Sequence, residues 1–308
     1  MSVSILIPCF NAERWIASAI ESAIGQTAPS DVIVLDDGST DRSVELIGKF
    51  KDQIRFEAGP NRGGNVARNR LLEMAQGEWV QFLDADDYLH PEKIERQLQT
   101  PNKPDSIDVI YSPVTCETWD GNSISDTSVI DVDVNQSLEE QWIRWQVAQT
   151  GGVLWKRESL MEIGGWNADF PCCQDNEITF RAIKSGLKFH FCGRADAVYR
   201  IWSDDTVCRR NPPKVIQYKT KLIDEMLKWL QSEGRLTESH SVAAGQAFFE
   251  MARTLTKFDP VAAESYASER IKAGTFSVTG PAAPRNYQLV YRVLGFRNAE
   301  RIAGWVRR

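Results

Sequence analysis

The first third of the chain alternates between short apolar segments and segments whose apolar residues recur at helical spacing. The apolar segments cover residues 3–8, 31–37, 54–58 and 79–84, and helical patterns follow them over 15–24, 41–50, 65–76 and from Pro91. Strands that are apolar throughout, in β-α-β-α order, are typical of a mostly parallel sheet with helices on both faces. We therefore predict an α/β fold with a Rossmann-like sheet, whose ligands bind outside the carboxyl ends of the strands.

Acidic residues gather where two of the predicted strands end. Asp36 and Asp37 close the second strand, and Asp84, Asp86 and Asp87 follow the fourth. Like charges this close repel one another unless a cation lies between them. Two carboxylates separated by one residue suit a hard cation such as Mg²⁺ or Mn²⁺, which also neutralises a diphosphate leaving group. The alternative is an Asp-rich turn in which Asp87 caps the next helix.

The rest of the chain divides into a less regular middle and a helical end. Residues 107–114 have the pattern of one more strand, and residues 121–130 that of a solvent-facing excursion. Helical patterns cover residues 213–233, 237–257 and 259–273. A chain of 308 residues suggests about two domains. We place the boundary after residue 207, with a helical extension over 208–308.

Composition and charge exclude several classes of protein. The net charge of -6 argues against a protein that coats nucleic acid. No apolar run approaches the ~18 residues that span a bilayer, and the N-terminus lacks the positive region of a signal peptide. We therefore expect a cytoplasmic protein. The six cysteines and three histidines show no zinc-site spacing.

Five motifs resemble, in this order, those of the family 2 glycosyltransferases with the GT-A fold: VSILIPCFNAERWI, VLDDGSTD, NRGGNVARN, GEWVQFLDADD and GGWNADFPCCQDNEITFRAIKSG. The resemblance covers roughly residues 1–200. It implies that residues 1–207 form a GT-A domain that binds a nucleotide sugar, with a UDP sugar favoured. It also implies inverting transfer of the sugar to a saccharide or lipid-linked acceptor, in the assembly of cell-surface polysaccharide or glycolipid.

The resemblance assigns a donor site to residues that follow the predicted strands. An acidic pair contacts the nucleoside, three residues line the base and ribose, and a glycine and an arginine lie beside the donor. In that order these are Asp36 and Asp37; Pro8, Phe10 and Glu13; Gly63 and Arg68. Asn11 has a plainer role, because we expect it to cap the first helix.

The resemblance also assigns the metal ligands and the base. Asp84 and Asp86 fall on the metal-binding DxD positions, with Mn²⁺ or Mg²⁺ as the cofactor. Asp175 falls on the general base, which takes the proton of the acceptor hydroxyl. The residue before it departs from the family pattern, since Gln174 replaces a glutamate. Trp202 stands where many relatives carry a histidine near the metal, which leaves that third contact in doubt. Capping of the next helix is the alternative role of Asp175.

The last segment, residues 285–308, is basic and rich in aromatic and aliphatic residues. Its six arginines face a single acidic residue, Glu300. A basic amphipathic helix on an acidic protein predicts contact with a membrane surface, which makes a peripheral position at the inner face of the membrane possible. The alternative is a helix packed on the core or on a second subunit.

Two other functions stay open. The nucleophile motif of HAD-type phosphotransferases is a strand followed by DxDGT, which VLDDGST resembles, although one intervening residue is missing and the strand is the second. A catalytically inactive, carbohydrate-binding relative would keep the motifs without turnover. Slow hydrolysis of a sugar nucleotide with Mn²⁺ would indicate a transferase, whereas preference for simple phosphate esters would indicate a phosphatase.

Overall fold

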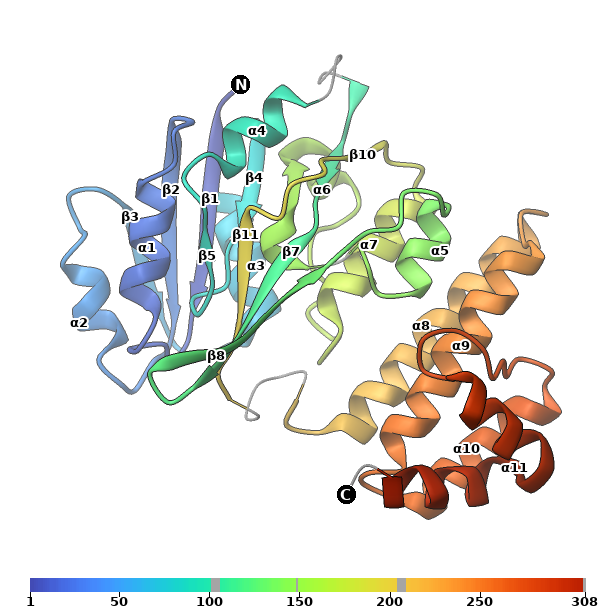
Figure 1. The fold of residues 1–308 in the computed structure, drawn as a ribbon. Helices are drawn as coiled ribbons and strands as arrows, with labels where there is room; N and C mark the ends of the chain where they lie inside the picture. Colours follow the sequence, from blue (N-terminus) through green and yellow to red (C-terminus); the bar gives the residue numbers. More distant parts are fainter. Residues whose placement is uncertain (101–105, 148, 204–208, 307–308) are drawn as a thin grey trace. The chain divides into compact units, whose positions relative to one another are not determined.

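The computed structural model describes residues 1–100, 106–147, 149–203 and 209–306 (Figure 1). The chain falls into two compact units, one of residues 1–134 and 146–203, and the other of residues 135–145 and the chain from residue 204 onward. The boundary expected after residue 207 lies within residues 204–208, outside the described residues, as does Cys208.

Seven strands of the described residues form the main sheet of the first unit, in the order β10-β6-β9-β4-β1-β2-β3. They are β1 (Val3–Cys9), β2 (Ser30–Asp37), β3 (Arg55–Gly59), β4 (Trp79–Phe82), β6 (Val109–Tyr111), β9 (Val153–Lys156) and β10 (Phe189–Phe191). Neighbours pair in parallel except at β9, which is antiparallel to both β4 and β6. The predicted, mostly parallel sheet is confirmed, and the carboxyl ends of β1, β2 and β4 lie at one edge.

Helices cover both faces of this sheet, which explains why its central strands are apolar throughout. They are α1 (Ile16–Ile24), α2 (Ser43–Gly48), α3 (Gly64–Met74), α4 (Lys93–Gln99), α6 (Arg157–Glu162) and α7 (Gln174–Lys184). Successive side chains of a strand point to opposite faces. Ile5 and Ile7 of β1 therefore share one core with Ile16 and Ile20 of α1, while α3 packs on β1 and β2 from the other side (Figure 1).

A smaller sheet in the same unit has the order β5-β11-β7-β8. Its strands are β5 (Tyr88–Leu89), β7 (Val114–Asp120), β8 (Ser123–Ile130) and β11 (Ala197–Ile201). The single strand expected over 107–114 is wrong: it divides into β6 and β7, which belong to different sheets. Pro113 lies at the break and has no N–H to continue a ladder. Residues 121–129 are exposed, as expected for a solvent-facing excursion, and β8 begins within this segment at Ser123.

The second unit is helical. It consists of α5 (Leu138–Ile143), α8 (Pro212–Ser232), α9 (Glu238–Leu255), α10 (Pro260–Lys272) and α11 (Arg285–Val306). Four of the starts have side-chain caps, from Ser137, Asn211, Thr237 and Asp259, and the last three fit the predicted helical patterns. α11 is kinked at Gly295, where φ is 72°. None of the helices in the described part of the chain is long and apolar enough to cross a bilayer.

Candidate active site

The carboxylates at the end of β2 are bound by backbone amides. Asp36 Oδ2 accepts hydrogen bonds from two N–H groups of the turn that follows, at 3.0 and 3.1 Å. Asp37 accepts from the N–H of Arg62 through Oδ1 (2.7 Å) and from that of Gly63 through Oδ2 (2.9 Å). Both aspartates are buried. Asp36 therefore holds the turn after β2, and Asp37 ties that turn to the loop after β3 at the carboxyl edge of the sheet.

Two glycines make this close approach possible. Gly38 has a φ of 78°, and a Cβ there would lie 2.5 Å from the backbone nitrogen of Asn61. Gly63, with a φ of 95°, directly precedes α3. Backbone with such a positive φ strongly favours glycine. The glycine predicted beside the donor thus has a structural reason for its identity: its N–H must reach Asp37.

The loop after β1 presents an aromatic side chain. Pro8 lies near the end of β1, paired with Leu35 of β2, and Phe10 beyond the strand is 51% exposed. The expectation that Asn11 caps α1 is wrong. Its Oδ1 accepts a hydrogen bond from the N–H of Thr40 at 2.8 Å, because its left-handed φ of 49° turns it toward the loop after β2.

Glu13 has a structural partner in the same pair of loops. Its Oε2 accepts a hydrogen bond from the N–H of Arg42 at 3.1 Å, and its own N–H donates to Asp41 Oδ2 at 3.0 Å. These two bonds cross-link the loop after β1 and the start of α2. The Glu13 carboxylate is therefore engaged, whereas the Phe10 ring is open to a ligand.

The first carboxylate after β4 is paired with an arginine of α3. Arg68 Nη2 lies 2.7 Å from Asp84 Oδ1. The guanidinium also lies over the ring of Trp166, 4.8 Å from its centroid. Its charge acts on Asp175 as well, since it opposes the rise in that residue's pKa. Arg68 thus connects two of the predicted site residues, which are far apart in the sequence.

The second carboxylate after β4 has a partner that the sequence did not reveal. Trp202 Nε1–H donates to Asp86 Oδ2 at 2.8 Å. Burial, and then the negative charge of Asp84, raise the pKa of Asp86, and the bond from Trp202 opposes this rise. Trp202 cannot ligate a metal as a histidine would, but it orients a carboxylate that can.

Asp87 is the third carboxylate of the acidic turn after β4. Its Oδ1 accepts the N–H of Arg200 at 2.8 Å, and the guanidinium of Arg200 lies over the rings of Trp15 and Tyr88 at 4.6 and 4.4 Å. Burial, and then the charges of its acidic neighbours, raise the pKa of Asp87 well above its usual range. Asp87 therefore holds β11 in place rather than capping α4, whose N-cap residue is Glu92.

Asp175 lies in the first turn of α7. Thr150 donates its hydroxyl to Asp175 Oδ1 at 2.7 Å. Burial raises the pKa of Asp175 to about 6, and the nearby charge of Arg68 only partly offsets this effect. A carboxylate with such a pKa is ionised at neutral pH and basic enough to take a proton. The α7 N-cap is Cys173, in left-handed conformation, so Asp175 is not the cap.

Asp84 and Asp86 together suit a hard divalent cation. Both offer carboxylate oxygens, and the half-buried Asp86 would be relieved of repulsion by a cation between the two. No group of three or more His, Cys, Asp or Glu side chains that could hold a metal occurs in the residues described. A metal here would thus take its other ligands from donor phosphates and water, as Mg²⁺ commonly does.

The structure brings Arg68, Asp84 and Asp175 together and leaves Asp36 and Asp37 with their own backbone partners. Sequence reasoning missed Thr150, the hydroxyl partner of Asp175, because nothing in its local pattern distinguishes it. It also passed over Asn65 and Asn69, although both belong to the NRGGNVARN motif and have the i,i+4 spacing that places side chains on one helix face.

Known proteins resemble this chain in sequence. A glycosyltransferase of Haemophilus influenzae is 40% identical over 101 residues, 31% of this chain and 40% of that protein. The putative glycosyltransferase EpsH of Bacillus subtilis is 26% identical over 257 residues, 77% of this chain and 71% of that protein. The chain thus spans less than half of the Haemophilus relative and most of EpsH.

Solved structures resemble it in fold. S. aureus TarS 1–349 in complex with UDP-GlcNAc has a TM-score of 0.58 at 15% identity, covering 98% of this chain and 91% of that one. The mannosyltransferase PcManGT of Pyrobaculum calidifontis, in complex with GDP-Man and Mn²⁺, has a TM-score of 0.51 at 16% identity, covering 99% and 86%. At such identities the likeness shows the fold alone, and it confirms the expected GT-A fold.

The family model described as "Glycosyl transferase family 2" matches residues 4–154. This stretch holds β1, β2 and β4 together with both acidic turns at their carboxyl ends. Residues 4–154 of the chain therefore form a glycosyl transferase family 2 domain.

Proposed function

We propose that this chain is an inverting glycosyltransferase. It moves a sugar from a nucleotide diphosphate donor, with a UDP sugar favoured, to a hydroxyl of a saccharide or lipid-linked acceptor in surface polysaccharide or glycolipid assembly. The observation that carries the proposal is the meeting of Arg68, Asp84 and Asp175 at the carboxyl edge of the sheet, in a family 2 chain. Relatives of the same fold that were solved with UDP-GlcNAc and with GDP-Man support it.

The β1 and β2 loops would bind the nucleoside. Asp36 Oδ1 is buried and has no hydrogen-bond partner among the described residues. A buried acceptor without a partner is unfavourable by about 1–3 kcal/mol. A ribose hydroxyl or a nucleobase N–H that donated to this oxygen would remove that penalty. Phe10, exposed nearby at the end of β1, offers a ring on which the base can stack.

The β4 turn would hold the diphosphate end of the donor through Asp84 and Asp86. A Mn²⁺ or Mg²⁺ ion bound there supplies positive charge for the leaving diphosphate. Arg68 lies within reach of the same charge, since it already pairs with Asp84. Trp202 keeps Asp86 oriented through its N–H.

Asp175 would act as the general base. As the acceptor oxygen forms its bond to the anomeric carbon, the bond to the leaving diphosphate breaks and the hydroxyl proton passes to the carboxylate. Thr150 holds Oδ1, and we assign the proton to the other oxygen. The absence of a neighbouring negative charge at Gln174 leaves the pKa of Asp175 to burial, Arg68 and Asp84.

The substitution Asp175→Asn tests this assignment. A general base typically contributes about 10²–10⁴-fold to the rate, and an amide cannot take the proton. We expect turnover of a sugar nucleotide to fall by that factor, while the affinity for UDP with Mn²⁺, measured by calorimetry, stays at the wild-type value. Near-normal turnover in the asparagine variant would refute the base. Weakened UDP binding would place Asp175 in the donor site instead.

A panel of UDP-glucose, UDP-GlcNAc and GDP-mannose, each with Mn²⁺, separates the remaining alternatives. An inactive carbohydrate-binding relative would hydrolyse none of them, and a phosphotransferase would prefer a simple ester such as p-nitrophenyl phosphate. Thermal shift ranks the donors first, because a ligand at 100 times its Kd adds roughly 2.7 kcal/mol of stability.

We also propose that α11 contacts an anionic membrane surface. One side of the helix is packed within its own unit, where Glu300 pairs with Arg253 at 2.6 Å and Tyr287 contacts Phe249. The exposed residues of α11, before and after the kink at Gly295, are mostly apolar or basic: Leu289, Val293, Leu294, Ile302 and Trp305, with Arg285, Arg292, Arg301 and Arg297, which lies 3.5 Å from Glu264. The acidic residue of the helix, Glu300, is buried, so the exposed side complements anionic lipid. Arg307 and Arg308 lie outside the described residues.

Substitutions on the exposed side test this contact without disturbing the packed side. The double variant Leu289→Ser/Val293→Ser should bind vesicles of phosphatidylglycerol less tightly than the wild type in a sedimentation assay, with an unchanged melting temperature. Vesicles of phosphatidylcholine serve as the uncharged control. If the variant instead changes the oligomeric state and leaves vesicle binding intact, the face is a subunit contact.

A further inference from the structure

Two asparagines of α3 hold the backbone of the loop that leads to α7. Asn65 Nδ2 donates to the carbonyls of Asn167 (2.6 Å) and Phe170 (3.0 Å). Asn69 donates from Nδ2 to the carbonyl of Trp166 at 2.7 Å and accepts the N–H of the same residue through Oδ1 at 2.8 Å. These amides bind backbone groups of the loop, so they fix its path.

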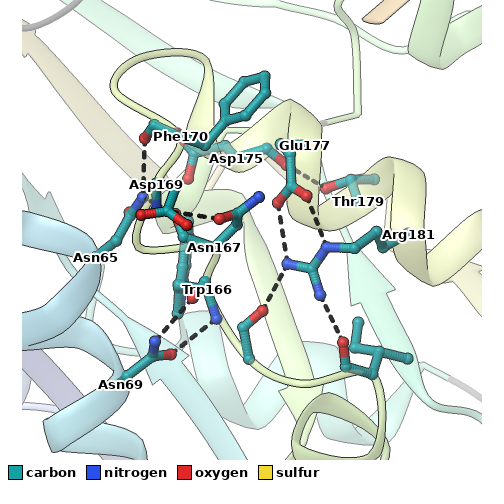
Figure 2. Close-up of polar contacts among 12 residues, drawn as sticks. Asn65, Asn69, Trp166, Asn167, Asp169, Phe170, Asp175, Glu177, Thr179 and Arg181 are labelled. Atoms are coloured by element: carbon teal, nitrogen blue, oxygen red, sulfur yellow. Dashed lines mark hydrogen bonds and ion pairs between the residues drawn. The ribbon is translucent and has the colours of Figure 1, made fainter. Parts of the chain in front are cut away.

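An arginine of α7 holds the same loop from the opposite side (Figure 2). Arg181 donates to the carbonyls of Ile163 (2.5 Å) and Gly165 (2.6 Å). Its guanidinium is itself oriented by a bidentate pair with Glu177, at 2.7 and 2.9 Å. We call Asn65, Asn69 and Arg181 the loop clamp, and residues 163–170 the clamped loop.

The clamped loop lies between the donor side of the site and the base. Arg68, the partner of Asp84, is adjacent to Asn69 in α3 and lies over the ring of Trp166, a residue of the loop. The Trp166 ring also packs edge-on against Phe82, at the end of β4. After the loop, the chain reaches Asp175 within the first turn of α7. The position of α7 relative to α3 therefore depends on this loop.

We propose that the loop clamp positions the base for transfer: Asn65, Asn69 and Arg181 keep Asp175 at a fixed place relative to Arg68 and Asp84. This role rests on the proposed glycosyltransferase function. Reacting groups must be held close to their productive geometry, and a displacement of 1 Å caused from a distance can lower a rate by about 100-fold. None of the three clamp residues needs to touch the substrate for this effect.

The substitution Asn69→Ala removes both hydrogen bonds to Trp166. We expect amide hydrogen exchange over the clamped loop to rise by at least about tenfold, because the loop then opens locally. Turnover of the sugar nucleotide selected from the donor panel should fall by about 10–100-fold. The donor KM, and the Kd of UDP with Mn²⁺, should stay near the wild-type values. Arg70→Ala, next along α3 and exposed, is the matched control and should change none of these quantities.

Gly165→Ala tests the same contact from the loop side. A Cβ at Gly165 would lie 2.7 Å from Asn69 Oδ1, so the added methyl group pushes the loop away from its clamp. This variant should reproduce the lower turnover and the faster exchange. Gly165 also has a φ of 62°, which strains an alanine with or without Asn69. In the double variant with Asn69→Ala only this strain remains, so the combined loss should be smaller than the product of the two single losses.

Each outcome decides one question. Unchanged exchange in Asn69→Ala would show that the clamp does not hold the loop. Faster exchange with normal turnover, or a loss explained by weaker UDP binding, would overturn the positioning role while leaving the transferase intact. A wild-type protein that hydrolyses no donor would overturn the transferase proposal, and the positioning role with it, whatever the exchange shows.

Discussion

Acidic residues lie at the carboxyl ends of both β2 and β4, but the two strand ends hold them in different ways. Asp36 accepts hydrogen bonds from backbone N–H groups of the turn after β2, and Asp37 from those of the loop after β3. Asp84 and Asp86 are bound by the side chains of Arg68 and Trp202. A backbone amide cannot leave without moving its loop, whereas a side chain can rotate away.

This difference separates two tasks within one site. Carboxylates tied to backbone shape a pocket and stabilise it, because their hydrogen bonds to the loops are in place before any ligand arrives. Carboxylates tied to side chains can change partners when a cation arrives, and the repulsion between Asp84 and Asp86 favours that change. We therefore expect substitutions at the carboxyl end of β4 to affect ligand binding, and those at the carboxyl end of β2 to affect stability as well.

The largest expected effect is at the carboxyl end of β4. Residues that contact only the ligands of a metal typically contribute about 10–100-fold to metal affinity. Asp84→Asn and Asp86→Asn should each weaken the metal-dependent binding of UDP by more than this factor, because each removes a direct ligand. Calorimetry with UDP, with and without Mn²⁺, measures this loss. Metal-free UDP binding and the melting temperature are the controls, and both should be retained. Unchanged affinity in both variants would remove the metal from the proposal.

An intermediate effect concerns pH. Because burial raises the pKa of Asp175 to about 6, turnover should fall about tenfold per pH unit below that value. The raised pKa also means that the folded state holds a proton more tightly than the unfolded chain. The stability from this group is therefore full below its unfolded value of 3.8 and is lost as the pH rises through about 6.

The pH profile of turnover, measured between pH 4.5 and 8, checks this prediction. Asp175→Asn should flatten the acidic limb of the residual activity, because the titrating group is gone. A limb of the same shape in that variant would assign the titration to another group.

The smallest expected effect is at the carboxyl end of β2. Asp37→Asn turns an amide N–H₂ toward the backbone N–H of Arg62 or Gly63, which leaves a buried donor without a partner and destabilises by about 1–3 kcal/mol. Urea unfolding should show this loss in Asp37→Asn and little change in Asp84→Asn. Equal losses of stability in Asp37→Asn and Asp84→Asn would contradict the distinction between the two strand ends.

Local pattern in the sequence was sufficient to predict β1 to β4 and the acidic turns that follow β2 and β4. Central strands of a parallel sheet must be apolar on both faces, and this requirement is visible in VSILIP. The antiparallel β9 was not predictable in the same way, because its place between β4 and β6 depends on pairing with distant segments. The break at Pro113 was visible in the sequence, but its consequence, a change of sheet, was not.

The candidate site shows the same limit. The positions of Asp84 and Asp86 follow from where a strand ends, so their roles could be proposed from sequence. The partners that orient them could not, since Trp202 reaches Asp86 across 116 positions and Asn69 reaches Trp166 across 97. Contacts of this kind depend on the folded chain and leave no periodic signal behind them.

The short helix α5 gives the order of synthesis a role in folding. It belongs to the helical unit although residues on both sides of it belong to the other unit. Its Trp142 and Ile143 are buried, and it packs on α8 and α9. At about 5–20 residues per second, a ribosome completes those two helices on the order of ten seconds after α5 emerges. During that time the growing chain carries an exposed tryptophan and isoleucine in the middle of a domain that is otherwise ready to fold, a segment suited to capture by a chaperone.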